Sequence, residues 1–320
     1  MRTRANGLLN TRATNAAALL SLFLSLALPA TSLAGELAVG RHVVLKSLDV
    51  PVINGARVTL PGTSYPKFRV VRIEGDWARV ASRSFHGWVR QSDLISLERA
   101  IAELSRAVER EPKIARALVP RGLVFMMFHQ WEAALADFDK AVSLDPNWAS
   151  ARVARAFLHD ERKDHDRAIA DLDDAIRIAP ADAEAYASRG EIRYAQRDYK
   201  RAIADFHHAI RIRPDFAQIR VSRSLARLGE YGLNSFPDNA QGGGGKHFST
   251  DPSDIGSIVA EINTAITLDP ECTMTLGAAA YVLMITGNVD ESLAELNKAI
   301  SRDPGEPWLY VRRGTFWQFR

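Results

Sequence analysis

The chain has 320 residues, of which 47% are hydrophobic and 25% are charged, a composition typical of a globular protein and not of a disordered one. It carries 41 basic and 38 acidic residues, which gives a formal net charge of +3 at pH 7. The excess comes from three arginines in the segment 1–34, which holds no acidic residue. The rest of the chain is electrically balanced, so composition gives no support to nucleic-acid binding.

The segment 1–34 has the pattern of a secretory signal peptide. Arginines precede an apolar run from Ala16 to Leu28, and Ser-Leu-Ala at 32–34 supplies the small residues of a cleavage site. The pattern predicts export and cleavage after Ala34. The mature protein would then lie in the periplasm or outside the cell, either free or associated with the cell envelope. The alternative is an uncleaved leader kept as an anchor, although the apolar run is shorter than the roughly 20 residues of a membrane span. After cleavage, we expect no membrane span.

Residues 35–97 change to short alternating runs broken by glycine and proline, which predicts strands at 42–45, 67–73 and 77–80. Gly-Asp-Trp at 75–77 and Gly-Trp-Val at 87–89 resemble the bacterial SH3-like domain, a small β-barrel. The resemblance implies a binding module for cell-wall peptides, glycans or proteins, with Trp77 and Trp88 as the candidate ligand face. The alternative is that both rings pack inside the barrel, because a domain of this size needs aromatic side chains to form a core.

From residue 98 onward, the sequence repeats with a period of about 34 residues, a length found in arrays of helix pairs. Prolines recur at this interval, apart from one longer step that corresponds to a repeat with an insertion: Pro112, Pro146, Pro180, Pro214, Pro270 and Pro304. Each repeat holds alanine at position 27: Ala107, Ala141, Ala175, Ala209, Ala265 and Ala299. Position 8 is always small: Gly122, Ala156, Gly190, Ser224, Ala280 and Gly314. This pattern, clearest in residues 183–216, resembles the tetratricopeptide repeat, in which two helices approach closely at the small residues.

The resemblance implies a multidomain β + α protein, with an SH3-like barrel followed by an all-α solenoid that winds as a right-handed superhelix of helix pairs. The predicted layout is a signal peptide (1–34), a barrel (35–97), a half repeat (98–114), repeats 115–148, 149–182 and 183–216, a split repeat 217–272 with a loop at 233–254, a repeat 273–306 and a terminal helix 307–320. We expect the barrel to cover the first helix of the solenoid, because stacked repeats expose a core at their ends. Pro120 is expected in the first turn of its helix. In the terminal helix, Phe316, Trp317 and Phe319 would lack a covering helix, so either the chain is truncated or this end packs on another molecule.

No phosphate-binding loop, nucleophile elbow or Cys-x-x-Cys motif occurs, so we predict a non-enzymatic protein without a cofactor or metal. Cys272 is the only cysteine, so no internal disulfide can form. The densest group of potential metal ligands, at 159–165, lies near a turn between helices, and metal binding there is the weaker alternative. The aspartates at 171, 173 and 174 are expected on the outer surface of a second helix.

In tetratricopeptide proteins the first helices line a concave groove that binds extended peptides. The matching positions in this chain are Leu123, Met126, Met127, Phe157, Asp160, Glu161, Glu191, Tyr194, Leu225, Leu228, Tyr281 and Met284. This predicted groove is apolar with an acidic middle, and it lacks the lysine and asparagine clamp that some members use for carboxy-terminal peptides. It favours an apolar or amphipathic segment with basic residues. The alternative for each residue is packing between helices.

Two functions follow from these patterns. The first is a protein–protein interaction scaffold in the cell envelope, which binds an extended or helical peptide segment in the groove of the repeats. The second is a cell-wall module, in which the barrel binds peptidoglycan or glycan and the repeats act as a spacer. A protein partner is therefore expected in the first case and a cell-wall component in the second, with no nucleic acid in either.

Overall fold

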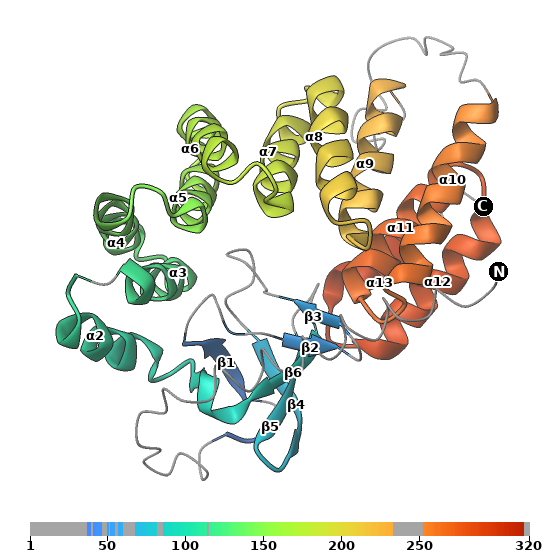
Figure 1. Cartoon of the computed structure of the whole chain (residues 1–320). Coiled ribbons are helices and arrows are strands. Elements are labelled where there is room, and N and C mark those ends of the chain that lie inside the picture. The colour runs from blue at the N-terminus through green and yellow to red at the C-terminus, as the bar shows by residue number, and fades with distance from the viewer. Residues whose placement is uncertain are drawn as a thin grey trace, which may run out of the picture. The chain divides into compact units, whose positions relative to one another are not determined.

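The computed structural model in Figure 1 describes residues 37–39, 41–46, 50, 52–54, 57–59, 68–81, 86–113, 115–232 and 252–316. The predicted leader at 1–34, most of the predicted loop at 233–254, and Trp317 and Phe319 lie outside these residues. The chain divides into the units Met1–Leu37 and Ala38–Arg320, and the description that follows concerns the second.

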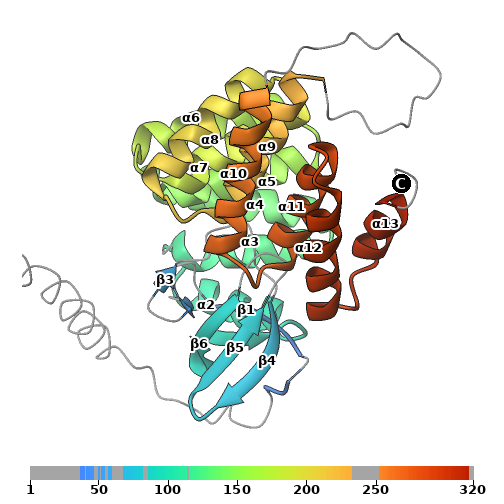
Figure 2. The same ribbon diagram turned by 90° about the vertical axis from the view of Figure 1, so that its right-hand side faces the viewer.

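An antiparallel sheet begins this unit, with seven strands in the order β3-β2-β6-β5-β4-β1-β7. The strands are β1 His42–Leu45, β2 Val52–Asn54, β3 Arg57–Thr59, β4 Phe68–Glu74, β5 Trp77–Ala81, β6 His86–Arg90 and β7 Leu94–Ser96. Figure 2 shows β4, β5 and β6 side by side. The predicted turn joins β4 to β5 at Gly75, whose φ of +54° suits glycine. The sequence analysis did not predict β2, β3, β6 and β7. Of these, β2, β3 and β7 have three residues each, which is too short to show alternation.

The sheet packs on the helix of the half repeat, α2 (Ala100–Arg110), without an intervening linker. This helix follows β7 within four residues. Val44 of β1 and Ile95 of β7 form a buried cluster with Ala100 and Leu104 of α2, and with Val124 of the next helix. The sheet thereby buries apolar surface at this end of the repeats, as the expectation of a covering domain required.

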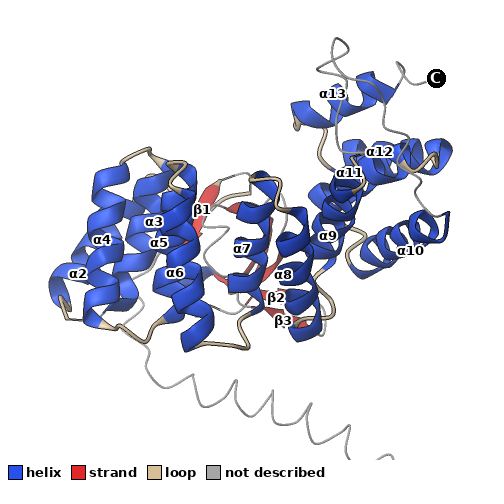
Figure 3. Ribbon diagram, turned by 90° about the horizontal axis from the view of Figure 1, so that it is seen from above, coloured by secondary structure: helices blue, strands red, loops and turns tan. Residues whose placement is uncertain are grey.

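The rest of the described chain is helical, with the strands confined to one region (Figure 3). The first helices of the repeats are α3 Leu118–Met127, α5 Ala149–Glu161, α7 Ala183–Ala195, α9 Ala217–Glu230, α11 Thr273–Ile285 and α13 Pro307–Phe316. The second helices are α4 Trp131–Leu144, α6 His165–Ile178, α8 Tyr199–Ile212, α10 Pro252–Leu268 and α12 Val289–Arg302. Pro120 is the third residue of α3, in its first turn, as predicted. The helix after the insertion begins at Pro252, slightly before the predicted end of the loop.

Each first helix also contacts the first helix of the next repeat. The contacting pairs are α3 with α5, α5 with α7, α7 with α9, α9 with α11, and α11 with α13. Neighbouring helices in the chain pack on one another as well. The first helices therefore form one continuous wall, which is the element that the predicted groove required.

The two helices of a repeat approach closely because small and large residues match across them. A Cβ atom on Gly122 would lie 2.4 Å from Cε1 of Phe138, and one on Gly190 would lie 2.6 Å from Cε1 of Phe206. Where position 8 is larger, the partner is smaller, as in the second repeat, whose matched residues at these positions are Ala156 and Leu172. The small residues at position 8 are thus explained by steric matching within each helix pair.

A ladder of arginine–carboxylate pairs joins consecutive repeats, which we call the arginine ladder. Its arginines occupy position 7 of four first helices: Arg121, Arg155, Arg189 and Arg223. Arg155 donates from Nε and Nη2 to both carboxylate oxygens of Asp171, at 2.8 and 2.6 Å, within its own repeat. It also donates from Nη1 to Asp139 of the preceding repeat, at 2.7 Å. Arg155 therefore holds its own helix pair together and fixes the pair to the one before it.

The arginine ladder corrects the expectation for one of the three aspartates at 171, 173 and 174. Asp171 is only 6% exposed and accepts the paired bonds of Arg155, whose position sixteen residues away on another helix the sequence did not reveal. Asp173 and Asp174 lie at the surface as expected, with side chains 54% and 42% exposed, and Asp173 accepts a bond from Arg189. The fifth repeat lacks this pairing, since Ala279 occupies the position of the arginine and leaves Glu295 bonded to Lys298.

Candidate functional site

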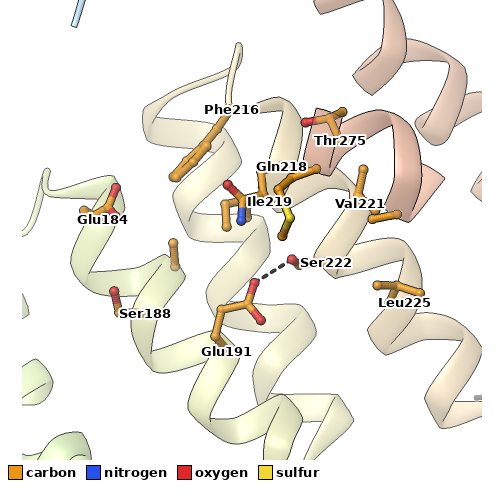
Figure 4. A pocket seen from close by; sticks show the side chains of 13 residues that line it. Glu184, Ser188, Glu191, Phe216, Gln218, Ile219, Val221, Ser222, Leu225 and Thr275 are labelled. Carbon is orange, nitrogen blue, oxygen red and sulfur yellow. Dashed lines mark hydrogen bonds between the residues drawn. The ribbon is translucent and has the colours of Figure 1, made fainter. Parts of the chain in front are cut away.

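A pocket of about 260 Å³ opens on the wall of first helices, between α7, α9 and α11. Figure 4 shows side chains from these three helices around it. The lining residues are Glu184, Ala187, Ser188, Glu191, Phe216, Gln218, Ile219, Val221, Ser222, Leu225, Met274, Thr275 and Ala278. Most are aliphatic or small, so the pocket is an apolar hollow with a few polar groups, as in sites that bind side chains of a partner.

Glu191 supplies the acidic group of this pocket. The hydroxyl of Ser222 on α9 donates a hydrogen bond to Oε1 of Glu191 on α7, at 2.5 Å (Figure 4). Burial raises the pKa of the Glu191 carboxyl, and the nearby carboxylate of Asp160 raises this pKa further, while the Ser222 hydrogen bond lowers it. The site therefore holds a carboxylate whose ionised form is poorly solvated.

Two tyrosines and an arginine belong to the same wall. Burial raises the pKa of Tyr194 on α7 to about 12, and the charges of Tyr281 on α11 and Arg312 on α13 also act on that pKa. The guanidinium carbon of Arg312 lies 4.6 Å from the ring centroid of Tyr281 and 5.5 Å from that of Trp308. Burial lowers the pKa of Arg312. These contacts bring side chains of α7, α11 and α13 into one electrostatic neighbourhood.

The structure brings some of the predicted groove residues to the pocket or its surroundings. Glu191 and Leu225 line the pocket, and Tyr194, Tyr281 and Met284 are partly exposed on α7 and α11. On α5, Oδ1 of Asp160 forms a hydrogen bond with Nδ1 of His165 at 2.9 Å, while Glu161 is exposed.

Other predicted residues pack between helices, the alternative considered for each of them. Leu123 and Met126 belong to the core of the first repeat, with Phe157 packed against it, and Leu228 is fully buried in the core that α9 shares with α10 and α11. Met127 packs against the cluster between the sheet and α2. Positions 9 and 12 therefore face a core of neighbouring helices at α3, whereas position 9 faces the pocket at α7 and α9.

Sequence reasoning identified Glu191 and Leu225 but missed the other residues of the stripe that lines most of the pocket. Positions 2, 6 and 9 of successive first helices provide it: Glu184, Ser188 and Glu191 on α7, Gln218, Ser222 and Leu225 on α9, and Met274 and Ala278 on α11. The spacing i, i+4, i+7 places such residues on one helix face. That spacing was a usable signal. The polar character of Ser188 and Ser222 concealed it, because serine on a helix is ordinarily assigned to solvent.

The two tryptophans of the sheet lie on the face away from its core. Ala78 and Val80 of β5 and Val89 of β6 are fully buried, whereas the alternating residues Trp77 and Trp88 are partly exposed. The guanidinium carbon of Arg90 lies 5.4 Å from the centroid of the Trp77 ring. The predicted ligand face is therefore accessible, and neither ring fills the core.

Among the described residues, no three His, Cys, Asp or Glu side chains are grouped so as to hold a metal ion. In the group at 159–165, His159 is buried, and Asp164 caps α6 by accepting a bond from the backbone N–H of Arg167 at 3.3 Å. Within the same part of the chain, no helix combines the length and the apolar character that crossing a membrane requires.

Helix pairs that recur with a period of about 34 residues and align their first helices define an α-helical repeat protein. Residues 96–151, 149–182 and 183–216 each match the tetratricopeptide repeat family. Residues 96–216 therefore consist of tetratricopeptide repeats, and a small antiparallel sheet precedes them. Repeats of this kind are typically non-catalytic scaffolds for proteins.

Solved structures of other repeat proteins resemble this one. A tetratricopeptide repeat protein from Parabacteroides merdae is 18% identical with a TM-score of 0.51, over 69% of this chain and 78% of that chain. Yeast Tom70 is 15% identical with a TM-score of 0.54, over 68% of this chain and 42% of that chain. At such identities the likeness shows the fold and not the ligand. No curated protein matches the chain in sequence.

Proposed function

We propose that the protein is a non-enzymatic scaffold that binds an extended or helical peptide segment of a protein partner against its first helices. The observation that carries this proposal is the pocket on α7, α9 and α11, which combines an apolar lining with Glu191, Ser188 and Ser222. Apolar walls supply affinity for a peptide, and a few fixed polar groups supply orientation. We further propose that the chain is exported and acts in the cell envelope, which the pattern of residues 1–34 supports.

A site-specific cross-linking experiment tests the scaffold. A photoreactive amino acid placed at Ala278, inside the pocket, is expected to form one discrete adduct with a partner in living cells. The matched control is the same substitution at Ala170, an exposed residue of the second helix α6. Equal labelling from both positions, or no adduct from Ala278, would contradict binding in the pocket. Cell fractionation and N-terminal sequencing of the same samples test export and cleavage after Ala34.

A second candidate is cell-wall binding through the sheet, because Trp77 and Trp88 are partly exposed on one face. We propose on this ground that the sheet belongs to an SH3-like barrel. Purified protein lacking residues 1–34 should then sediment with cell-wall sacculi, and the double variant Trp77→Ala, Trp88→Ala should not. Arg72→Ala, an exposed change on β4, is the control. Sedimentation that survives the tryptophan changes would exclude this role for the face.

A further inference from the structure

We propose that the pocket between α7, α9 and α11 receives a lysine or arginine side chain of the bound peptide, with the Glu191 carboxylate as its ionic partner. This inference rests on the proposed function and names the residue class that the site selects.

The first argument is the incomplete pairing of Glu191. Oε1 of Glu191 accepts the Ser222 hydrogen bond, whereas an ionised carboxylate offers about four acceptor positions on its two oxygens. Among the described residues, the charged group that acts on Glu191 is Asp160, which is itself an acid. A cation from outside the chain would thus meet one poorly solvated carboxylate and a second one nearby.

The second argument is the contrast between Glu191 and neighbouring acids that are paired with arginine. In the third repeat Asp205 accepts paired bonds from Arg189 and another from Arg193, at 2.6 to 3.1 Å. In the pocket itself, Glu184 is bonded to Arg213 at 3.4 Å. The chain supplies these acids with guanidinium groups, whereas the partly buried Glu191 has a serine hydroxyl as its hydrogen-bond partner. Its carboxylate can therefore accept a cation brought by a ligand.

The third argument is the shape and lining of the pocket. Its volume of about 260 Å³ suits one long side chain better than a whole cofactor, for which sites of roughly 300–1,000 Å³ are usual. Ile219, Val221 and Ala278 offer aliphatic surface on its walls. Lysine and arginine bury their methylene stems on such surface while the charged end reaches a carboxylate. The pocket therefore fits the apolar stem and the charged end together.

The experiment is a selection of a random peptide library displayed on phage, carried out on the immobilised protein lacking residues 1–34. The wild-type protein should enrich peptides with lysine or arginine at one fixed position, next to apolar residues. Glu191→Gln should lose that enrichment, and Glu132→Gln should keep it. Glu132 is a matched control because its side chain is 84% exposed on the second helix α4. Folding of each variant is checked by circular dichroism. Glutamine can still accept the Ser222 bond, so Glu191→Gln should fold.

Affinities of one selected peptide then test the ionic contact directly. Replacing its arginine by citrulline keeps the shape and removes the charge, and should weaken binding to the wild-type protein about tenfold to a hundredfold. For Glu191→Gln the two peptides should bind within about twofold of each other. Enriched peptides without a basic residue, or an unchanged arginine preference in Glu191→Gln, would overturn the inference while leaving the scaffold intact. A wild-type protein that enriches no peptide at all would overturn both.

Discussion

The third repeat (183–216) and the fifth repeat (273–306) have the same helix-pair architecture but stabilise it differently. In the third, Arg189 pairs with Asp205 across the two helices, with Asp205 only 2% exposed. In the fifth, the matched residues are Ala279 and Glu295, and Oε2 of Glu295 is buried without a hydrogen-bond partner among the described residues. The fold therefore tolerates the loss of the arginine at this position. The acidic residue, Glu295, is still present in the fifth repeat, and its unpaired buried oxygen is expected to lower the stability of that repeat.

The same two repeats also differ in steric matching and in the turn between their helices. Gly190 faces Phe206 in the third repeat, whereas Ala280 and Leu296 hold the matched places in the fifth. The residue between the helices is left-handed in both, at Arg197 with φ 64° and at Gly287 with φ 87°. These matched positions allow each contribution to be exchanged between repeats and measured.

The largest effect is expected from Arg189→Ala, which gives the third repeat the alanine of the fifth. We expect the free energy of unfolding to fall by about 3 kcal/mol, because the buried Asp205 loses the paired bonds of Arg189. The remaining bond from Arg193 limits the loss. Urea denaturation of the chain without residues 1–34, followed by circular dichroism, measures the change. Arg201→Ala removes an exposed arginine, 73% accessible and paired with Asp198, and is the control. A loss no greater than that of the control would contradict the importance of the arginine ladder.

Steric matching predicts the next largest effect. Gly190→Ala should lower the free energy of unfolding by about 2 kcal/mol, because the new methyl group would lie 2.6 Å from the Phe206 ring. Adding Phe206→Leu to this variant should recover part of the loss, since it recreates the alanine and leucine of the second and fifth repeats. Denaturation of both single variants and the double variant measures this coupling. Strict additivity of the two changes would argue against steric matching.

Completing the arginine ladder in the fifth repeat should stabilise the protein. Ala279→Arg is expected to raise the free energy of unfolding by about 1 kcal/mol, since a guanidinium group can then bond the buried Oε2 of Glu295. The thermal unfolding midpoint provides the measurement. The gain should disappear when Glu295→Gln is present, and a gain that persists there would have to come from something other than the ion pair.

The smallest effect concerns the turn between helices. Arg197→Gly should stabilise the third repeat by about 0.5 kcal/mol, because a side chain at φ 64° is strained and glycine is not. Gly287→Arg in the fifth repeat should have the opposite sign. Thermal unfolding of both variants tests the pair, and effects of equal sign would show that chain entropy, and not the left-handed conformation, dominates.

The sequence predicted the repeats because packing of helix pairs depends on residue size at fixed spacing. Gly190, Ala202 and Ala209 revealed the close approach of α7 and α8 without any knowledge of the fold. The arginine ladder was missed because its partners are on different helices, and only the packing shows which acid meets Arg155. A separation of sixteen residues is not a familiar local signal, unlike the i, i+4 pairs within one helix.

The candidate site was predicted only in part. Glu191 and Leu225 were identified, whereas Ser222 and Arg312 were not, because which positions face the pocket depends on the rotation of each helix within the wall. The first repeat adds a further difference, since Met126 and Leu123 hold groove positions but lie in a core formed with neighbouring helices. Repeat position alone therefore predicts the wall, and packing decides which residues of the wall remain accessible.

The arginine ladder has a consequence for the length of the protein. Arg155 reaches sixteen residues forward and sixteen residues back. If residues 149–182 were removed as a block, Arg189 would follow Asp139 at the spacing it now has from Asp173, and both are aspartates. A whole repeat can thus be deleted or duplicated here without separating Arg189 from an aspartate, whereas a cut of another size within these helices would do so. The split repeat shows the other permitted place for a change of length, because its insertion lies between α9 and α10 and Arg223 still pairs with Glu261. The ladder therefore restricts changes of length in this part of the chain to whole repeats or to the turns between helices.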